Sequence, residues 1–442
     1  MNAICICLVV GLMTFPHHVD GQILKKLAKK AEEAAERTIE RRVERETEES
    51  TDKALDKVFE KDNKTKDSPN RSADQSADGM MTSGDAAVGA ATTRTFASYG
   101  KFDFIPGDNV IAIEDFAQDA VGDFPAKWNT NSSGEVRTIE GREGKWLALT
   151  TKGSVTPDFI TELPENFTLE FDLAVTPDYS YYDASLWISM ASFSGSSGFT
   201  AWTQFGAGKK DGVVVTIHPQ DAGGAAKGRS GYSFWEGGKV TMENDMGALD
   251  AFNNKDKNIV KISIWRQNQR LRFYVDETKV WDLPRAFAKD VQYNGLVFDR
   301  DGAAEGNQYL ISNLRLAVGT PDTRSKLIKE GKFSTTGIYF NSGSAVIKPE
   351  SYGILKEIAT VLEENAAVHV SIIGYTDGDG SDELNLKLSK ARAEAVKAAL
   401  DGEFGISGDR MQTDGKGESE PVGDNSTPTG RAQNRRVEFI KK

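Results

Sequence analysis

Cysteine is nearly absent from this chain. Of its 442 residues only 2 are cysteines, Cys5 and Cys7. Both lie in the apolar run from Ala3 to Phe15, which is too short to span a bilayer and resembles the core of a secretory signal, although no Lys or Arg precedes it. We therefore expect a signal peptide over residues 1–21, with a buried strand or short anchor as the alternative. The exported protein would then contain no thiols, disulfides or cysteine metal sites.

Positive charge and histidine are also scarce. Lys and Arg number 54 against 66 Asp and Glu, giving a formal net charge of −12. Phosphate backbones require a basic surface, so the composition argues against a nucleic-acid partner. The 4 histidines are His17 and His18, inside the expected signal, and His218 and His369, far apart in the sequence. The acidic run from Asp377 to Glu383 lacks the spacing of a calcium loop. We predict no metal site and no cofactor.

Two segments that are poor in aromatic residues follow the expected signal peptide. Residues 22–60 are dense in charge of both signs, with a narrow apolar stripe at helical spacing from Leu24 to Val43. They are typical of a solvated helix with i,i+4 ion pairs, and a short coiled coil is the alternative. Residues 61–95 are rich in Asp, Ser, Asn and Gly, which predicts a flexible linker.

Residues 102–318 contain all 7 tryptophans and recurring short runs of alternating polarity. In FTLEFDLAV, Phe167 and Leu169 point to one face, and Glu170 and Asp172 point to the other. This pattern predicts an antiparallel β-sandwich with one face of the sheet in water. Tight turns at 268–269 and 276–277 predict three consecutive strands. The order of these runs resembles the concanavalin-like (laminin-G-like) jelly-roll family, a likeness of fold that carries no diagnostic site.

The spacing of apolar residues over 332–442 predicts a compact two-layer α/β domain with its elements in the order β-α-β-α-β-β. Strands are expected at 338–340, 368–374, near Met411, and at 436–440. Helices are expected to begin at Pro349 and to span 384–400. The fold class is thus multidomain, an all-β sandwich followed by an α/β domain.

Polar residues gather where the second of these strands meets the second helix. Asp377 follows the strand, and Asn385 and Arg392 lie two helical turns apart on one face. A carboxylate and a guanidinium placed together suit a zwitterionic ligand. An internal Asp–Arg salt bridge that ties the loop to the helix remains the alternative.

The C-terminal residues carry a series of motifs in a fixed order, from GYTDGDG and LSKARA to GKGESEP and GRAQNRRVEF. This series resembles the OmpA-like peptidoglycan-binding domain, which includes porin tails, peptidoglycan-associated lipoproteins and flagellar stator subunits. The resemblance implies non-covalent binding of the meso-diaminopimelate of the peptidoglycan stem peptide, in the periplasm and near the outer membrane. The residues that it implies at the site are Asp377 and Arg392 for the amino acid, Asn385, Thr376 and Arg436 around it, and Asn341 where many relatives have Asp.

Three functions are open for the whole chain. The first is a non-catalytic protein that tethers a sandwich, which would bind a glycan or a protein, to the wall. The second is a wall-anchored glycoside hydrolase, suggested by Glu170 and Asp172, although Val175 stands where a third acid is expected. The third is a carbohydrate-binding sandwich that uses aromatic side chains as stacking platforms, with Tyr179, Tyr181, Tyr182 and Trp187 as candidates.

Overall fold

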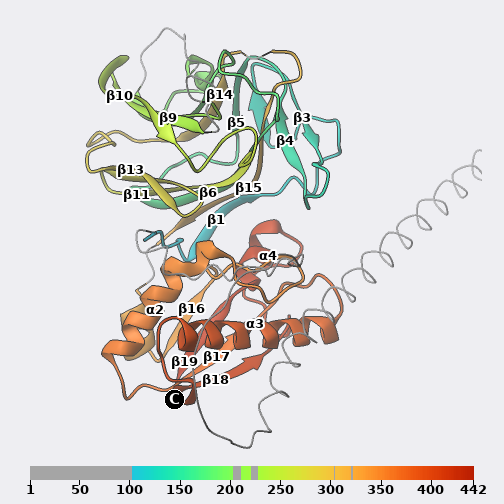
Figure 1. The fold of residues 1–442 in the computed structure, drawn as a ribbon, viewed down its shortest axis with the longest axis vertical. Coiled ribbons are helices and arrows are strands. Elements are labelled where there is room, and N and C mark those ends of the chain that lie inside the picture. Colours follow the sequence, from blue (N-terminus) through green and yellow to red (C-terminus); the bar gives the residue numbers. More distant parts are fainter. Residues whose placement is uncertain (1–101, 203–210, 221–226, 303, 320–321) are drawn as a thin grey trace, which may run out of the picture. The chain divides into compact units, whose positions relative to one another are not determined.

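The computed structural model describes residues 102–202, 211–220, 227–302, 304–319 and 322–442 (Figure 1). The expected signal peptide, charged helix and linker lie outside the described residues, so those three predictions stay untested. Among the described residues, no helix is long and apolar enough to cross a membrane.

Two antiparallel sheets form the middle of the chain, as the alternating runs predicted (Figure 1). Within the described residues, one sheet has eight strands, in the order β13 (Thr278–Leu283), β12 (Arg270–Val275), β11 (Ile259–Gln267), β6 (Asn166–Val175), β15 (Tyr309–Val318), β4 (Trp146–Leu149) and β3 (Gly134–Arg137), with β1 (Asn109–Glu114) also pairing with β15. The other has seven described strands, in the order β10 (Lys239–Leu249), β9 (Gly228–Glu236), β8 (Asp211–His218), β7 (Leu186–Ser192), β14 (Gly295–Arg300), β5 (Gly153–Pro157) and β2 (Trp128–Thr130). The sandwich is therefore confirmed, and its concanavalin-like subtype stays a prediction.

The inward-facing residues of both sheets make one apolar core. Phe167 and Leu169 of β6 are buried in it together with Ile188 of β7. The two predicted turns join β11, β12 and β13, with Asn268 at φ 52° and Asp276 at φ 47°. Asn and Asp tolerate this left-handed conformation better than other non-glycine residues, which explains their place in both turns.

At β6, the outer face of the eight-stranded sheet is not exposed to water as the sequence predicted. Glu170 is only 1% exposed and accepts hydrogen bonds from Arg315 Nη1 at 2.9 Å and from the Tyr339 hydroxyl at 2.8 Å. Alternation placed Glu170 on the outer face, but it could not reveal that Tyr339, far along the chain, covers it. Here the prediction of a solvated face is wrong.

Among the described residues, the C-terminal part forms a four-stranded sheet with two long helices packed on it (Figure 1). The sheet order is β16 (Lys332–Thr335), β19 (Val437–Lys441), β17 (Val370–Gly374) and β18 (Met411–Gly415), with β17 and β18 parallel. The helices α2 (Tyr352–Glu364) and α3 (Asp382–Gly402) bury Ile358 and Val396 against the sheet. The short helical turns are Gly198–Ala201 (η2), Ser325–Lys329 (η4), Pro349–Ser351 (η5) and Gly408–Arg410 (η6).

Two details of this part differ from the predicted order. The first strand is β16, and the run expected as a strand at 338–340 makes only an isolated bridge from Phe340 to Ile347. A short helix, α4 (Pro428–Asn434), lies between β18 and β19. Its signals are Thr427, whose side chain accepts a hydrogen bond from Gly430 N, and Pro428 in the first turn.

Candidate functional site

The loop that follows β17 holds Asp377 at the end of the sheet. Tyr375 N donates to Arg436 O at 3.0 Å, and Thr376 N donates to Gly417 O at 2.9 Å. These bonds continue the strand to Asp377, whose carboxylate forms an ion pair with Arg435. Asp377 therefore already has a cationic partner, and the side chain of that partner is half-exposed.

Asn385 fixes the same loop from the first turn of α3. The helix begins after Ser381, whose side chain accepts from Leu384 N. The Asn385 amide, buried at 5% exposure, donates to Asp379 O at 3.0 Å and to the Glu418 carboxylate at 2.6 Å. Since its donors are engaged by the protein, Asn385 positions the loop around Asp377.

Arg392 lies two turns further along α3 and is held on one side only. Its Nε donates to Ser344 O at 3.1 Å, and its guanidinium sits 4.9 Å above the ring of Phe340. Burial lowers the pKa of Arg392 to about 10, with Asp377 opposing the shift and Arg435 adding to it. The group is still cationic at neutral pH. Among the described residues, none forms an ion pair with Arg392 or accepts a hydrogen bond from its two terminal nitrogens.

Two glycines bring α3 close to the strand ends. A Cβ on Gly374 would lie 2.1 Å from Ser389 O, and one on Gly415 would lie 2.4 Å from Lys390 N. Only glycine permits this approach. The tight packing sets the position of Arg392 relative to the loop that carries Asp377.

Two of the remaining predicted residues, Thr376 and Asn341, lie around these groups. Thr376 is 3% exposed, and its hydroxyl is buried without a hydrogen-bond partner in the described structure. Asn341 is exposed on the loop that carries Ser344, and its backbone N donates to Val346 O at 3.1 Å. Asn341 is therefore placed beside the segment that holds Arg392.

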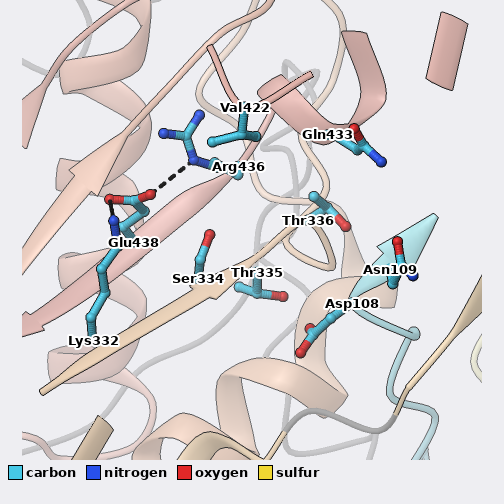
Figure 2. Close-up of a pocket in the computed structure, with 10 residues that line it drawn as sticks. All are labelled: Asp108, Asn109, Lys332, Ser334, Thr335, Thr336, Val422, Gln433, Arg436 and Glu438. Atoms are coloured by element: carbon cyan, nitrogen blue, oxygen red, sulfur yellow. Dashed lines mark hydrogen bonds and ion pairs between the residues drawn. The ribbon is translucent and has the colours of Figure 1, made fainter. Parts of the chain in front are cut away.

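Arg436 is placed elsewhere, and Arg435 takes the position next to Asp377. Arg436 Nε donates to Glu438 at 2.9 Å, its Nη2 donates to Glu420 O at 3.0 Å, and its side chain lines a separate pocket (Figure 2). Consecutive residues entering a strand point to opposite faces, so one of the two arginines of the NRR motif faces Asp377 and the other faces away. The resemblance implied that Arg436 lies around the site; in the structure Arg435 pairs with the Asp377 carboxylate, and Arg436 pairs with Glu438.

The two carboxylates considered for hydrolysis are engaged by the protein. Glu170 is bound by Arg315 and Tyr339, and Asp172 accepts from Asn313 at 2.6 Å and pairs with Lys261 at 3.4 Å. Among the described residues, no group of His, Cys, Asp and Glu could hold a metal ion.

Comparison with known proteins places the C-terminal motifs in a family. The model of the OmpA family matches residues 339–435. The Probable lipoprotein YiaD of Escherichia coli is 44% identical over 102 residues, which are 23% of this chain and 46% of that protein. The Peptidoglycan-binding protein ArfA of Mycobacterium tuberculosis is 41% identical over 103 residues, 23% of this chain and 31% of the relative. The chain thus spans less than half the length of these curated relatives.

A solved structure shows a likeness over the same share of the chain. The peptidoglycan-associated lipoprotein from Burkholderia pseudomallei is 31% identical, with a TM-score of 0.23 over 25% of this chain and 89% of that chain. The sequence matches above confirm, for residues 339–435, the resemblance to the OmpA-like family that the motif order indicated.

Proposed function

We propose that the C-terminal domain binds peptidoglycan non-covalently and takes the meso-diaminopimelate of a stem peptide between Asp377 and Arg392. The match to the OmpA family and the name of the relative ArfA support binding to the wall. The separate cationic and anionic groups on one loop and one helix support an amino acid as the recognised unit.

Arg392 is the observation that carries this proposal. Taking a guanidinium out of water is unfavourable unless an anion or hydrogen-bond acceptors compensate it. Ser344 O and the Phe340 ring compensate one side of Arg392, while no described carboxylate pairs with it. A ligand carboxylate would supply the missing partner through two parallel hydrogen bonds, the geometry that guanidinium favours.

Asp377 would take the ammonium of the same amino acid. This is supported by its ion pair with Arg435, a cation whose side chain is half-exposed. Binding then exchanges Arg435 for the ligand ammonium at this carboxylate. Each charge-assisted contact is worth about 1.5–3 kcal/mol, enough together for a specific but reversible complex.

The proposed cellular role is that of a non-catalytic tether. Wall binding by residues 332–442 would hold the sandwich of residues 102–318 in the periplasm, and association with the outer membrane is part of the same proposal. The expected export signal over residues 1–21 is consistent with this location.

The direct test is co-sedimentation of the full chain with purified sacculi, in competition with free meso-diaminopimelate. We expect Arg392→Ala and Asp377→Ala each to lower the bound fraction by about tenfold or more, as loss of one charged contact implies. Lys387→Ala is the control, since this half-exposed lysine lies on the same helix and pairs only with Glu383 among the described residues. Wild-type binding by both site variants, with unchanged melting temperatures, would refute the assignment.

A further inference from the structure

The loop between β6 and β7 displays two adjacent tyrosines to solvent. Of the aromatic side chains that the structure describes, only Tyr181 and Tyr182 are more than a third exposed, at 37% and 94%. Their rings meet edge to face, with centroids 5.5 Å apart. Exposure of an aromatic ring gives up the free energy that its burial would provide, so this pair is a candidate for ligand contact.

The loop that carries this pair is held firmly in place. Asp183 accepts hydrogen bonds from Ser180 N at 2.7 Å and from Asn307 Nδ2 at 2.9 Å. Just before the pair, Tyr179 is fully buried, and its carbonyl accepts from Asn254 Nδ2 at 2.9 Å. Both ends of the loop are therefore anchored to the sandwich. A rigid aromatic display loses little conformational entropy when a ligand binds.

A cation that forms no ion pair with any described residue lies next to the two tyrosines. The Arg229 guanidinium sits 4.7 Å above the Tyr181 ring, and its Nε is buried with no hydrogen-bond partner in the described structure. None of the described residues forms an ion pair with Arg229. The nearby Asp183 carboxylate is engaged by its own loop, and His218 is held neutral because burial lowers its pKa. Among the described residues, the site therefore combines an aromatic surface with a positive charge that has no ion-pair partner.

We propose that Tyr181, Tyr182 and Arg229 form a binding site for an acidic saccharide. The apolar C–H face of a sugar ring stacks on Tyr182, and a carboxylate on the sugar pairs with Arg229. Tyr181 links the two, because it contacts the ring of Tyr182 on one side and the guanidinium on the other. A neutral saccharide would leave the guanidinium unpaired. This site lies on the sandwich and does not depend on the wall contact at Asp377.

Isothermal titration of the full chain with oligogalacturonate, and with the methyl ester of the same oligomer, tests the proposal. The ester keeps the ring and removes the charge. We expect saturable binding of the acid form and about tenfold weaker binding of the ester. Tyr182→Ala and Arg229→Gln should each weaken binding of the acid form by about tenfold, and Tyr182→Phe should retain it. Val121→Ala, at a 59% exposed position elsewhere on the sandwich, is the control.

Several results would overturn the inference. These are equal binding of the acid and the ester, wild-type affinity in Tyr182→Ala with an unchanged melting temperature, and no saturable binding of either oligomer. If poly-glutamate bound as tightly and lost affinity in the same variants, the site would belong to an acidic peptide and the saccharide assignment would be wrong. The double variant Asp377→Ala, Arg392→Ala should bind oligogalacturonate as the wild type does, which separates this site from the proposed wall contact.

Discussion

At the candidate site of the C-terminal domain, two neighbouring arginines have different partners. Arg435 pairs with Asp377, and Arg436 pairs with Glu438 on the other side of β19. The NRR motif alone does not reveal which arginine faces Asp377, because the register of the last strand is set by pairing with β16 and β17. The strand end and the helical spacing predicted that Asp377, Asn385 and Arg392 lie near one another, while their role in binding a ligand stays a prediction.

Asp276 gives a residue-scale prediction about pH. Burial in the turn between β12 and β13 is the main cause that raises its pKa from 3.8 to about 7, and its Oδ1 accepts a hydrogen bond from Lys261 N at 2.8 Å. A carboxyl with a raised folded-state pKa stabilises the fold when protonated, and this stability is lost as pH rises from about 4 through about 7. An asparagine at position 276 cannot ionise and tolerates the positive φ of 47°. It also retains a side-chain oxygen that can accept the hydrogen bond from Lys261 N.

We therefore expect Asp276→Asn to raise the melting temperature by a few degrees at pH 8 and by clearly less at pH 5. Thermal unfolding followed by circular dichroism at both pH values measures this difference. Asp123→Asn, at an exposed position, is the control and should show no such pH dependence. An equal effect of Asp276→Asn at the two pH values would contradict the argument.

On the scale of elements, the contact of α3 with β17 determines the geometry of the site. Gly374→Ala would place a methyl group 2.1 Å from Ser389 O, so the helix must move away from the strand. We expect a loss of about 1–3 kcal/mol in the free energy of unfolding, the usual cost of overpacking. Sacculus binding should fall as well, because Arg392 moves with the helix. Urea denaturation and co-sedimentation measure the two effects.

Gly402→Ala is the matched control for that variant. Gly402 is the last residue of the same helix, and an added Cβ there would meet no atom within 4 Å. It should leave wall binding unchanged and stability nearly so. If both glycine variants behaved alike, close packing at Gly374 would not be what positions Arg392.

The elements that sequence predicted well are those with a clear local period. The alternation in β6 and the apolar faces of α2 and α3 gave those elements within a few residues of their observed bounds. The seven-residue helix α4 was missed because it is too short to show a helical period. The run 338–340 looks like a strand locally, but Phe340 pairs only with Ile347.

On the scale of the molecule, the buried Glu170 joins residues from distant parts of the chain. It binds Arg315 of the neighbouring strand β15 and Tyr339 of the C-terminal part. We expect Tyr339→Phe to reduce the free energy of unfolding by about 1–3 kcal/mol, because one hydrogen bond to a buried charge is lost. Urea denaturation measures this, with Tyr182→Phe as the control at an exposed hydroxyl. Equal stability of Tyr339→Phe and the wild type would show that the hydroxyl contributes nothing.

Arg435 has a consequence for how firmly the proposed wall contact would hold. The ligand ammonium would replace Arg435, which already pairs with Asp377, so breaking that half-exposed ion pair would offset part of the free energy gained at the carboxylate. The affinity of the proposed complex would thereby be kept modest and its formation readily reversible. A protein attached in this way can release one stem peptide and take the next, and so stay associated with a polymer that is continually cut and resynthesised.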